Sequence, residues 1–351
     1  MRNLCHALIA AGGLVLSSAG GVSLAPAADA AKSQMPGVFE PAEQKTIVPE
    51  GAQLEALWTE GEFTEGPVPD AQGGILFSDI GDRIMRFDPA NKQVTVFRAP
   101  SGKANGLKFN PAGKLVACEG AGAGGNRRIS ITGADGQPHT LAERFRGKRF
   151  NSPNDLAIAA SGAVYFSDPR YVGDEPRELD FEGVFVVTPQ GEVRVATRDV
   201  QKPNGVIVTP DGKTVYVSDN NNTADGHHQL VAFAVQTDGT LADKGVLFDF
   251  GPGARGIDGM TLDADGNIYA TAGRNEKAGV YVFSPQGAPW AFIPTPGDPT
   301  NCVFGIGDEA STLYITSATA RAESGGPRPP YGLYRIRLAK PGYHVFPKPR
   351  S

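Results

Sequence analysis

The chain has 351 residues, a formal net charge of −5 and 40% hydrophobic residues, so it is long and apolar enough to bury a sizeable core. It contains no pronounced basic run, which argues against nucleic acid as a partner. Its 45 glycines and 28 prolines are typical of many turns and short strands, and no long segment shows helical periodicity.

The N-terminus has the features of a secretory signal peptide. Arg2 provides a positive charge, Ala7–Leu16 is an apolar run too short to span a bilayer, and small residues follow at Ala25–Ala27 and Ala28–Ala30. We expect residues 1–30 to be removed and the mature protein to be periplasmic or secreted, without a membrane anchor. A disordered N-terminal tail is the alternative.

A hairpin pattern in the middle of the chain organises the rest. Within Lys202–Asn220, the apolar run Val206–Val208 is followed by the turn Pro210–Lys213 and by a second β-branched run, Thr214–Val217. Glycine and aspartate suit such a tight turn, because glycine tolerates positive φ and aspartate bonds its own backbone. The pattern therefore predicts two antiparallel strands.

This hairpin recurs along the chain. Including the first, about six copies follow one another roughly 40–54 residues apart, which is the period of a four-stranded propeller blade. The other copies are Glu65–Ile80, Asn105–Gly120, Asn154–Pro169, Asp258–Gly273 and Asn301–Thr319.

The repeat predicts an all-β fold, a six-bladed β-propeller of four-stranded antiparallel blades. Each hairpin would form the two inner strands of a blade. The last copy is followed by one clear strand, Tyr331–Leu338, so we expect Gln53–Trp58 to complete the sixth blade and close the ring with both chain ends. Residues 31–52 would form an N-terminal extension and residues 53–345 the propeller. Cys118 and Cys302 lie in different copies, which favours separate buried thiols over a disulfide.

The first residue of every copy carries a side-chain oxygen. A radial repeat places equivalent positions in a ring, so the sequence predicts one channel mouth lined with carboxylate and amide oxygens. Such oxygens suit a hard cation such as Ca²⁺, whereas Zn²⁺ prefers histidine or cysteine, and no copy contains histidine. The residues are Glu65, Asn105, Asn154, Asn204, Asp258 and Asn301.

Structural roles are the alternative, both for the ring residues and for a second set of aspartates in the hairpins. An Asn-Gly or Asp-Gly pair at the start of a strand is also common turn chemistry. Asp79, Asp168 and Asp219 end the second strand of their hairpins, and their repetition at a matching place favours a structural hydrogen-bonding role over catalysis.

Over roughly residues 50–340 the chain resembles the gluconolactonase/regucalcin family of six-bladed propellers, which hydrolyse lactones with a metal ion at the channel mouth. It is more distantly similar to serum paraoxonases. The motifs that carry the resemblance are Thr64-Glu65-Gly66-Pro67, Asn151-Ser152-Pro153-Asn154-Asp155, Lys202-Pro203-Asn204-Gly205, Gly256-Ile257-Asp258-Gly259 and Pro299-Thr300-Asn301-Cys302.

The resemblance implies Glu65, Asn204 and Asp258 as metal ligands. Asn154 matches a residue that is a ligand in some members and faces the substrate in others. Asn105 stands where paraoxonases have a catalytic histidine, and this difference favours a substrate contact over a histidine mechanism. The ion would be one divalent cation, Ca²⁺ first, with Mg²⁺, Mn²⁺ or Zn²⁺ as alternatives.

We therefore interpret the chain as a metal-dependent hydrolase that opens a sugar lactone. Asp258 would accept the proton, while Asn105, Asn154 and Arg170 would orient the substrate. One alternative is a periplasmic sugar-binding propeller with a structural ion, and another is a phosphotriesterase-like hydrolase, since propellers host many functions. The oligomeric state is not readable from the sequence.

Overall fold

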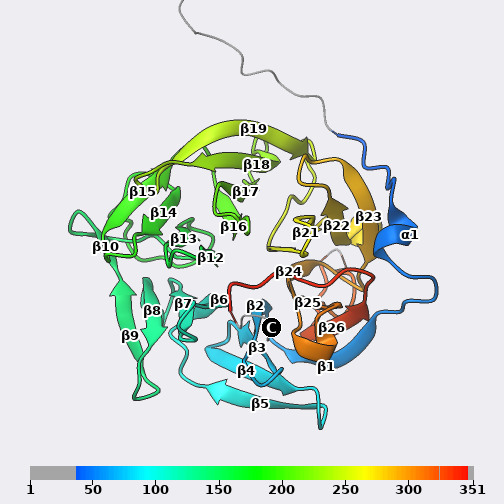
Figure 1. Ribbon diagram of the computed structural model, residues 1–351. Helices are drawn as coiled ribbons and strands as arrows, with labels where there is room; N and C mark the ends of the chain where they lie inside the picture. Colours follow the sequence, from blue (N-terminus) through cyan, green and yellow to red (C-terminus); the bar gives the residue numbers. More distant parts are fainter. Residues whose placement is uncertain (1–36, 324, 347–351) are drawn as a thin grey trace, which may run out of the picture. The chain divides into compact units, whose positions relative to one another are not determined.

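The computed structural model describes residues 37–323 and 325–346. In these residues the strands form six four-stranded antiparallel sheets, arranged as the blades of a propeller (Figure 1). This confirms the predicted fold, and each predicted hairpin supplies the first two strands of one blade. The predicted signal peptide, residues 1–30, lies outside the described residues.

The first three blades follow one another along the chain. The first consists of β2 (Thr64–Pro69), β3 (Ile75–Asp79), β4 (Arg83–Asp88) and β5 (Gln93–Arg98). The second consists of β6 (Ala104–Phe109), β7 (Leu115–Glu119), β8 (Arg128–Thr132) and β9 (Pro138–Ala142). The third, which follows a small hairpin, consists of β12 (Leu156–Ile158), β13 (Val164–Ser167), β14 (Val184–Val187) and β15 (Val193–Thr197). The hairpin comprises β10 (Arg144–Phe145) and β11 (Lys148–Arg149).

The last three blades complete the ring. The fourth consists of β16 (Pro203–Val208), β17 (Thr214–Asn220), β18 (His228–Val235) and β19 (Leu241–Asp249). The fifth consists of β20 (Met260–Leu262), β21 (Ile268–Ala272), β22 (Gly279–Phe283) and β23 (Pro289–Pro294). The sixth consists of β24 (Pro299–Phe304), β25 (Thr312–Ala318), β26 (Tyr331–Arg337) and β1 (Glu55–Gly61). Short helical turns are α1 (Gln44–Ile47), η1 (Asn275–Lys277) and η2 (Gly307–Glu309).

The chain ends close the ring as predicted. β1, from the N-terminal side, pairs antiparallel with β26, the last strand of the chain. The first strand of each blade contacts the first strand of the next, in the order β2, β6, β12, β16, β20 and β24, and β24 contacts β2 again. These six strands therefore surround the central channel. Within the described residues, no helix is long and apolar enough to cross a membrane.

Apolar side chains fill the spaces between neighbouring blades. Six clusters of buried residues each join two adjacent blades, so burial of apolar surface holds the ring together. Cys118 belongs to the cluster between the second and third blades, and Cys302 to the one between the fifth and sixth. Both are free, buried thiols, which confirms the prediction that they do not pair.

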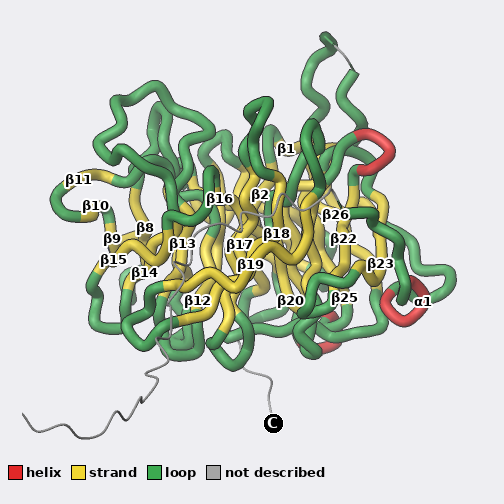
Figure 2. Tube along the Cα trace, turned by 90° about the horizontal axis from the view of Figure 1, so that it is seen from above, coloured by secondary structure: helices red, strands yellow, loops and turns green. Residues whose placement is uncertain are grey.

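Strand direction decides which loops meet at which end of the channel. The first strand of a blade runs away from the end where the predicted oxygen ring lies, and the second strand returns to it. The loops between second and third strands therefore lie at that end, and Figure 2 shows long loops along the upper side of the molecule. β26 runs in the opposite sense to β25, so the residues after it lie at the far end of the channel.

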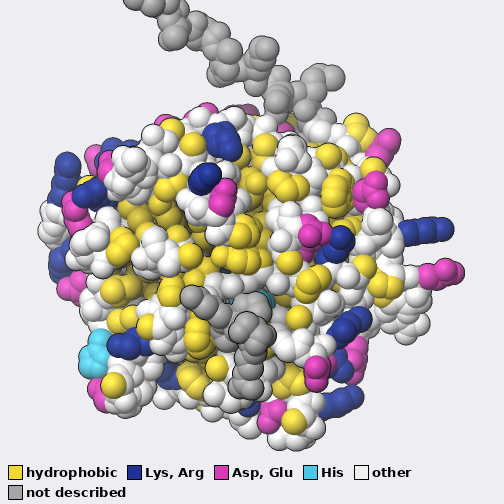
Figure 3. Space-filling view, in the orientation of Figure 1, with side chains coloured by type: hydrophobic (Ala, Val, Ile, Leu, Met, Phe, Trp, Pro, Cys, Tyr) yellow, Lys and Arg dark blue, Asp and Glu magenta, His cyan; other side chains and the backbone are white. Residues whose placement is uncertain are grey.

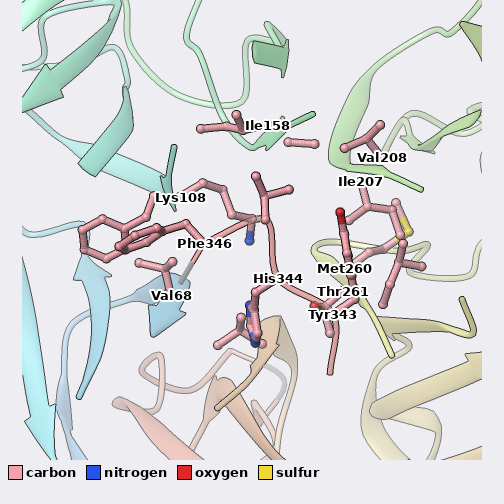
Figure 4. A pocket seen from close by; sticks show the side chains of 15 residues that line it. Val68, Lys108, Ile158, Ile207, Val208, Met260, Thr261, Tyr343, His344 and Phe346 are labelled. Atoms are coloured by element: carbon pink, nitrogen blue, oxygen red, sulfur yellow. The ribbon is translucent and has the colours of Figure 1, made fainter. Parts of the chain in front are cut away.

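The C-terminal segment crosses this far end. Tyr343 donates its backbone N–H to Leu262 O at 3.0 Å, and the Phe346 ring lies 5.9 Å from that of Phe109. Hydrophobic side chains are prominent in the middle of this face (Figure 3). Beneath the segment is a cavity of about 70 Å³, which Lys108 and His344 help to line (Figure 4). A space of this size holds a few water molecules but no sugar.

His344 makes the attachment of this segment sensitive to pH. Its Nε2 lies 3.1 Å from Gly305 O, and burial lowers its pKa to about 4. The unfolded chain, with an ordinary histidine pKa, therefore binds more protons between about pH 4 and 6.5. The contribution of neutral His344 to the free energy of unfolding is therefore fully present above that pH range and is lost as the pH falls through it.

We expect the wild type to lose about 1–2 kcal/mol more unfolding free energy between pH 7 and 5 than the His344→Gln variant, since one pKa unit corresponds to about 1.4 kcal/mol. Urea unfolding at both pH values measures this difference. His139→Gln, at an exposed histidine, is the matched control and should behave as the wild type. Equal pH dependence in wild type and His344→Gln would contradict the assignment.

Candidate functional site

The six ring residues lie where the first strand of each blade begins. Glu65, Asn105, Asn204 and Asn301 are within β2, β6, β16 and β24, whereas Asn154 and Asp258 each stand two positions before the first residue of β12 and β20. The innermost strands converge on the channel, so residues from all six blades meet at one mouth.

Backbone hydrogen bonds join these positions from blade to blade. The N–H groups of Gly106 and Gly205 donate to Asn154 O and Asp258 O, both at 2.8 Å. A Cβ on Gly205 would lie only 2.4 Å from Asp258 O, and one on Gly106 only 2.7 Å from Asp155 Oδ1. Glycine follows the ring residue at these positions because the next blade approaches so closely, not because the chain turns there.

Glu65 is buried among other acidic groups. It is 3% exposed, and burial raises its pKa well above the usual range. The charges of Asp258 and Asp155 raise it further, whereas hydrogen bonds to Glu65 Oε2 oppose the shift, from Gly66 N–H at 2.9 Å and from Asn301 Nδ2 at 3.2 Å. Glu65 is therefore close to Asp258, a residue almost 200 positions away along the chain.

Asp258 shares this environment but has a cationic partner. Burial raises its pKa to about 6, while the Arg255 guanidinium and the Asn204 amide hold it down. Arg255 Nη2 donates to Asp258 Oδ2 at 2.7 Å, and both side chains are largely buried. The charge of Asp258 thus acts on Glu65, and the bond from Gly205 N–H to Asp258 O places Asn204 beside them.

Asp155 is a member of the cluster that sequence reasoning missed. It is 3% exposed, and its Oδ1 accepts a hydrogen bond from Leu156 N–H at 2.8 Å. Burial raises its pKa, whereas the Lys108 charge lowers it. A signal existed in the repeat, because Asp155 occupies the position where four of the other five copies have glycine.

Arg255 and Tyr171 complete the surroundings. Arg255, three residues before Asp258, was not predicted, and only its proximity to Asp258 in sequence could have suggested it. The Tyr171 hydroxyl donates to Asn220 O at 2.8 Å, and burial together with the Asp258 charge raises the pKa of Tyr171 well above its usual range.

The predicted substrate residues lie in different environments. Asn105 Oδ1 is buried without a hydrogen-bond partner among the described residues, which leaves an oxygen available to a ligand. Asn154 is half-buried at the mouth. Arg170 is 9% exposed and donates Nη1 to Gly173 O at 3.1 Å and to Glu175 O at 2.9 Å, so these bonds hold its own loop. Its substrate contact stays a prediction.

The donor set fits a hard cation in its chemistry. Buried carboxylates with raised pKa values and amide oxygens would be stabilised by a divalent ion. Across residues 37–323 and 325–346, no three His, Cys, Asp or Glu side chains form a metal-binding group. A site here would therefore depend on asparagine oxygens beside Glu65 and Asp258.

Two cavities in the described part of the chain lie elsewhere. One is the space beneath the C-terminal segment, and the other, of about 660 Å³, lies between the sixth and first blades and includes Asp308 and His344 in its wall. Neither is lined by a predicted site residue. We assign the site by its chemistry, because size alone does not provide converging polar groups.

The aspartates at the ends of the second strands have a structural role, as expected. Each accepts two consecutive backbone N–H groups of the segment that leads into its blade: Asp79 from Glu62 and Phe63, Asp168 from Asn151 and Ser152, and Asp219 from Gln201 and Lys202. These bonds fix the chain just before the ring residues of the first, third and fourth blades.

A family model described as SMP-30/Gluconolactonase/LRE-like region matches residues 63–319. A gluconolactonase of Zymomonas mobilis is 30% identical over 292 residues, which cover 76% of this chain and 79% of that protein. A solved gluconolactonase from Xanthomonas campestris is 29% identical with a TM-score of 0.71, covering 87% of this chain and 96% of its own.

A calcium-binding protein, regucalcin, from Agrobacterium tumefaciens has the same fold. It is 22% identical with a TM-score of 0.64, and the match covers 84% of this chain and 96% of that one. The family resemblance expected from the motifs is thereby confirmed.

We expect Asp219→Ala to lower the free energy of unfolding by about 2–3 kcal/mol, because two N–H groups lose a charged acceptor at a buried site. Chemical denaturation measures the change. Asp243→Ala is the matched control in the same blade, since Asp243 is exposed and accepts one N–H, from Gly245, at 2.7 Å; it should change stability by less than about 0.5 kcal/mol. Similar effects of both variants would contradict a structural role for Asp219.

Proposed function

We propose that this protein, which belongs to the SMP-30/Gluconolactonase/LRE-like family, is a lactonase that opens a sugar lactone at the mouth of its channel. The observation that carries the proposal is the buried cluster of Glu65, Asn204 and Asp258. Its two carboxyl groups have raised pKa values, so ionising both costs free energy that a bound cation would offset. The identity to the Zymomonas mobilis gluconolactonase supports the substrate class.

Glu65, Asn204 and Asp258 would hold one divalent cation, with Asn154 as a further oxygen donor. Carboxylate and amide oxygens suit Ca²⁺ first, and Mg²⁺ and Mn²⁺ accept the same ligands. The calcium-binding regucalcin of the same fold supports this order. When bound, the ion would supply Lewis-acid polarisation of the lactone carbonyl.

Two asparagines would orient the substrate. The unpartnered Asn105 Oδ1 would accept a hydrogen bond from a sugar hydroxyl, which gives this buried oxygen the partner that it lacks. Asn154, at the same mouth, would make a second contact. Two polar contacts from different blades hold a small ring in one orientation, which raises the rate by placing its carbonyl correctly.

Asp258 would accept the proton. Without an ion, burial raises its pKa to about 6, and a bound cation would lower that value. Water attacks the carbonyl carbon and its proton passes to Asp258. The ring C–O bond then breaks, and the same proton passes to the departing ring oxygen, giving an open-chain hydroxy acid. Arg255 Nη2 donates to Asp258 Oδ2, so the other oxygen, Oδ1, would serve both the cation and this transfer.

We expect Asp258→Asn to reduce glucono-δ-lactone hydrolysis by about 10²–10⁴-fold, because the amide cannot take the proton. Acid release in weakly buffered solution with a pH indicator measures the rate, after subtraction of spontaneous hydrolysis in the presence of heat-inactivated protein. Asp243→Asn, an exposed aspartate on β19, is the matched control and should retain full activity.

We expect a chelator to abolish the activity and added Ca²⁺ to restore it, since Glu65 and Asp258 would then lack the cation that balances them. Glu65→Gln should not be restored by Ca²⁺ at concentrations that restore the wild type. Full activity of the wild type with chelator present, or of Asp258→Asn, would overturn the proposed mechanism.

A further inference from the structure

The residues just outside the oxygen ring also occupy a repeated position. In five blades, the carbonyl oxygen of one such residue accepts the N–H of a residue at the end of the second strand. These five residues form the rim of the channel mouth, directly before the first strands. The bonds run from Ile80, Gly120, Asn220, Gly273 and Ala318 to Phe63, Lys103, Lys202, Arg255 and Asp298, each at 3.0 Å.

Three of the five rim residues are cationic, and one of these is already paired. Arg255 Nη2 donates to Asp258 Oδ2 at 2.7 Å. The two rim lysines, Lys103 and Lys202, have no carboxylate partner in the part of the chain that the structure describes. The lysines that form ion pairs there are Lys92 and Lys340. The rim thus has two positive charges that no acidic side chain balances.

Lys202 is held at the rim by an aromatic ring. Its ammonium lies 4.8 Å from the centre of the Tyr171 ring, at cation–π distance. The ring itself is fixed, because the Tyr171 hydroxyl donates to Asn220 O at 2.8 Å. Tyr171 belongs to a loop of the third blade, so the ammonium leans from the fourth blade toward the third. Lys202 is half-buried, and its three ammonium N–H groups stay available to a ligand.

Lys103 is held at the rim by its backbone. Its φ is +58°, a left-handed conformation that favours glycine, and its N–H donates to Asp82 Oδ1 at 3.1 Å. Its Nζ lies 3.3 Å from Ile80 O, which is a neutral acceptor in the first blade. A side chain at a position where glycine would cost less points to a function of that side chain.

We propose that Lys202, supported by Lys103, recognises a negatively charged group of the substrate, so that the preferred substrate is an anionic sugar lactone. The inference rests on the proposed function and adds the charge of the substrate to it. Each rim lysine stands two residues before a ring residue, a distance of about 7 Å along a strand. This is comparable to the span of a sugar lactone from its carbonyl to the opposite substituent. With the carbonyl at the oxygen ring, a carboxylate or phosphate on that substituent would lie at the rim.

The test compares glucono-δ-lactone, which is neutral, with its 6-phosphate and with glucaro-δ-lactone, which has a carboxylate at the same end. With Ca²⁺ present, we expect kcat/KM to be about 10-fold higher for at least one anionic lactone, since hydrogen bonds between charged groups are the stronger ones. Lys202→Gln should lower this preference about 10-fold and Lys103→Gln about 3-fold. Added NaCl should lower it as well, because salt screens charges. The two anionic lactones show whether carboxylate or phosphate fits better.

Lys213→Gln and Lys114→Gln are the matched controls. These exposed lysines lie in the turns at the opposite ends of the same two hairpins, so both variants should keep the wild-type preference. Equal kcat/KM for neutral and anionic lactones, or an unchanged preference in Lys202→Gln, overturns the charge recognition and leaves the proposed function standing. A protein that opens none of the three lactones overturns both.

Discussion

The candidate site depends on the close approach of neighbouring blades at the channel mouth. Backbone N–H groups just after the ring residues donate to the next blade, as at Gly205 and Asp258, and a side chain in place of that glycine would block the contact. The spacing between blades is therefore set by hydrogen bonds directly beside the functional side chains. A change that loosens this contact would also spread the oxygens of the cluster apart.

The close approach of the blades brings acidic side chains together, and their mutual repulsion costs electrostatic free energy. Glu65, Asp155 and Asp258 are buried near one another, and the pKa of each is raised, with burial as the largest cause. Arg255 and Lys108 offset part of the repulsion, the first by a direct bond to Asp258 and the second through its charge, which lowers the pKa of Asp155. A protein gains nothing in stability from such a cluster. Its presence is better explained by a ligand that the carboxylates would bind.

The sequence predicted the parts that repeat. The hairpin period led to six blades, to closure by β1 and β26, and to a ring that contains Glu65, Asn204 and Asp258. It could not predict Arg255, because its contact with Asp258 depends on side-chain directions in a loop, which no period describes. Asp155 could have been predicted, because it replaces the glycine that four of the other five copies have at its position. Arg170 is the opposite case. Its position two residues after Asp168 led to the prediction of a substrate contact at the channel mouth, but its hydrogen bonds are to its own loop.

The asparagines of the ring explain how one repeated position serves two purposes. Asn301 donates Nδ2 to Glu65 Oε2, while its Oδ1 accepts Cys302 N–H at 2.9 Å, so both ends of its amide have a protein partner. Asn204, next to Asp258 in the ring, lowers the pKa of that carboxyl, and in the described residues no backbone N–H donates to its oxygen. An amide can thus steady a neighbouring carboxylate with its hydrogens and still offer an oxygen, which an aspartate at the same position cannot do. The ring thus has an asparagine next to each of its acidic residues, with Asn301 bonded to Glu65 and Asn204 beside Asp258.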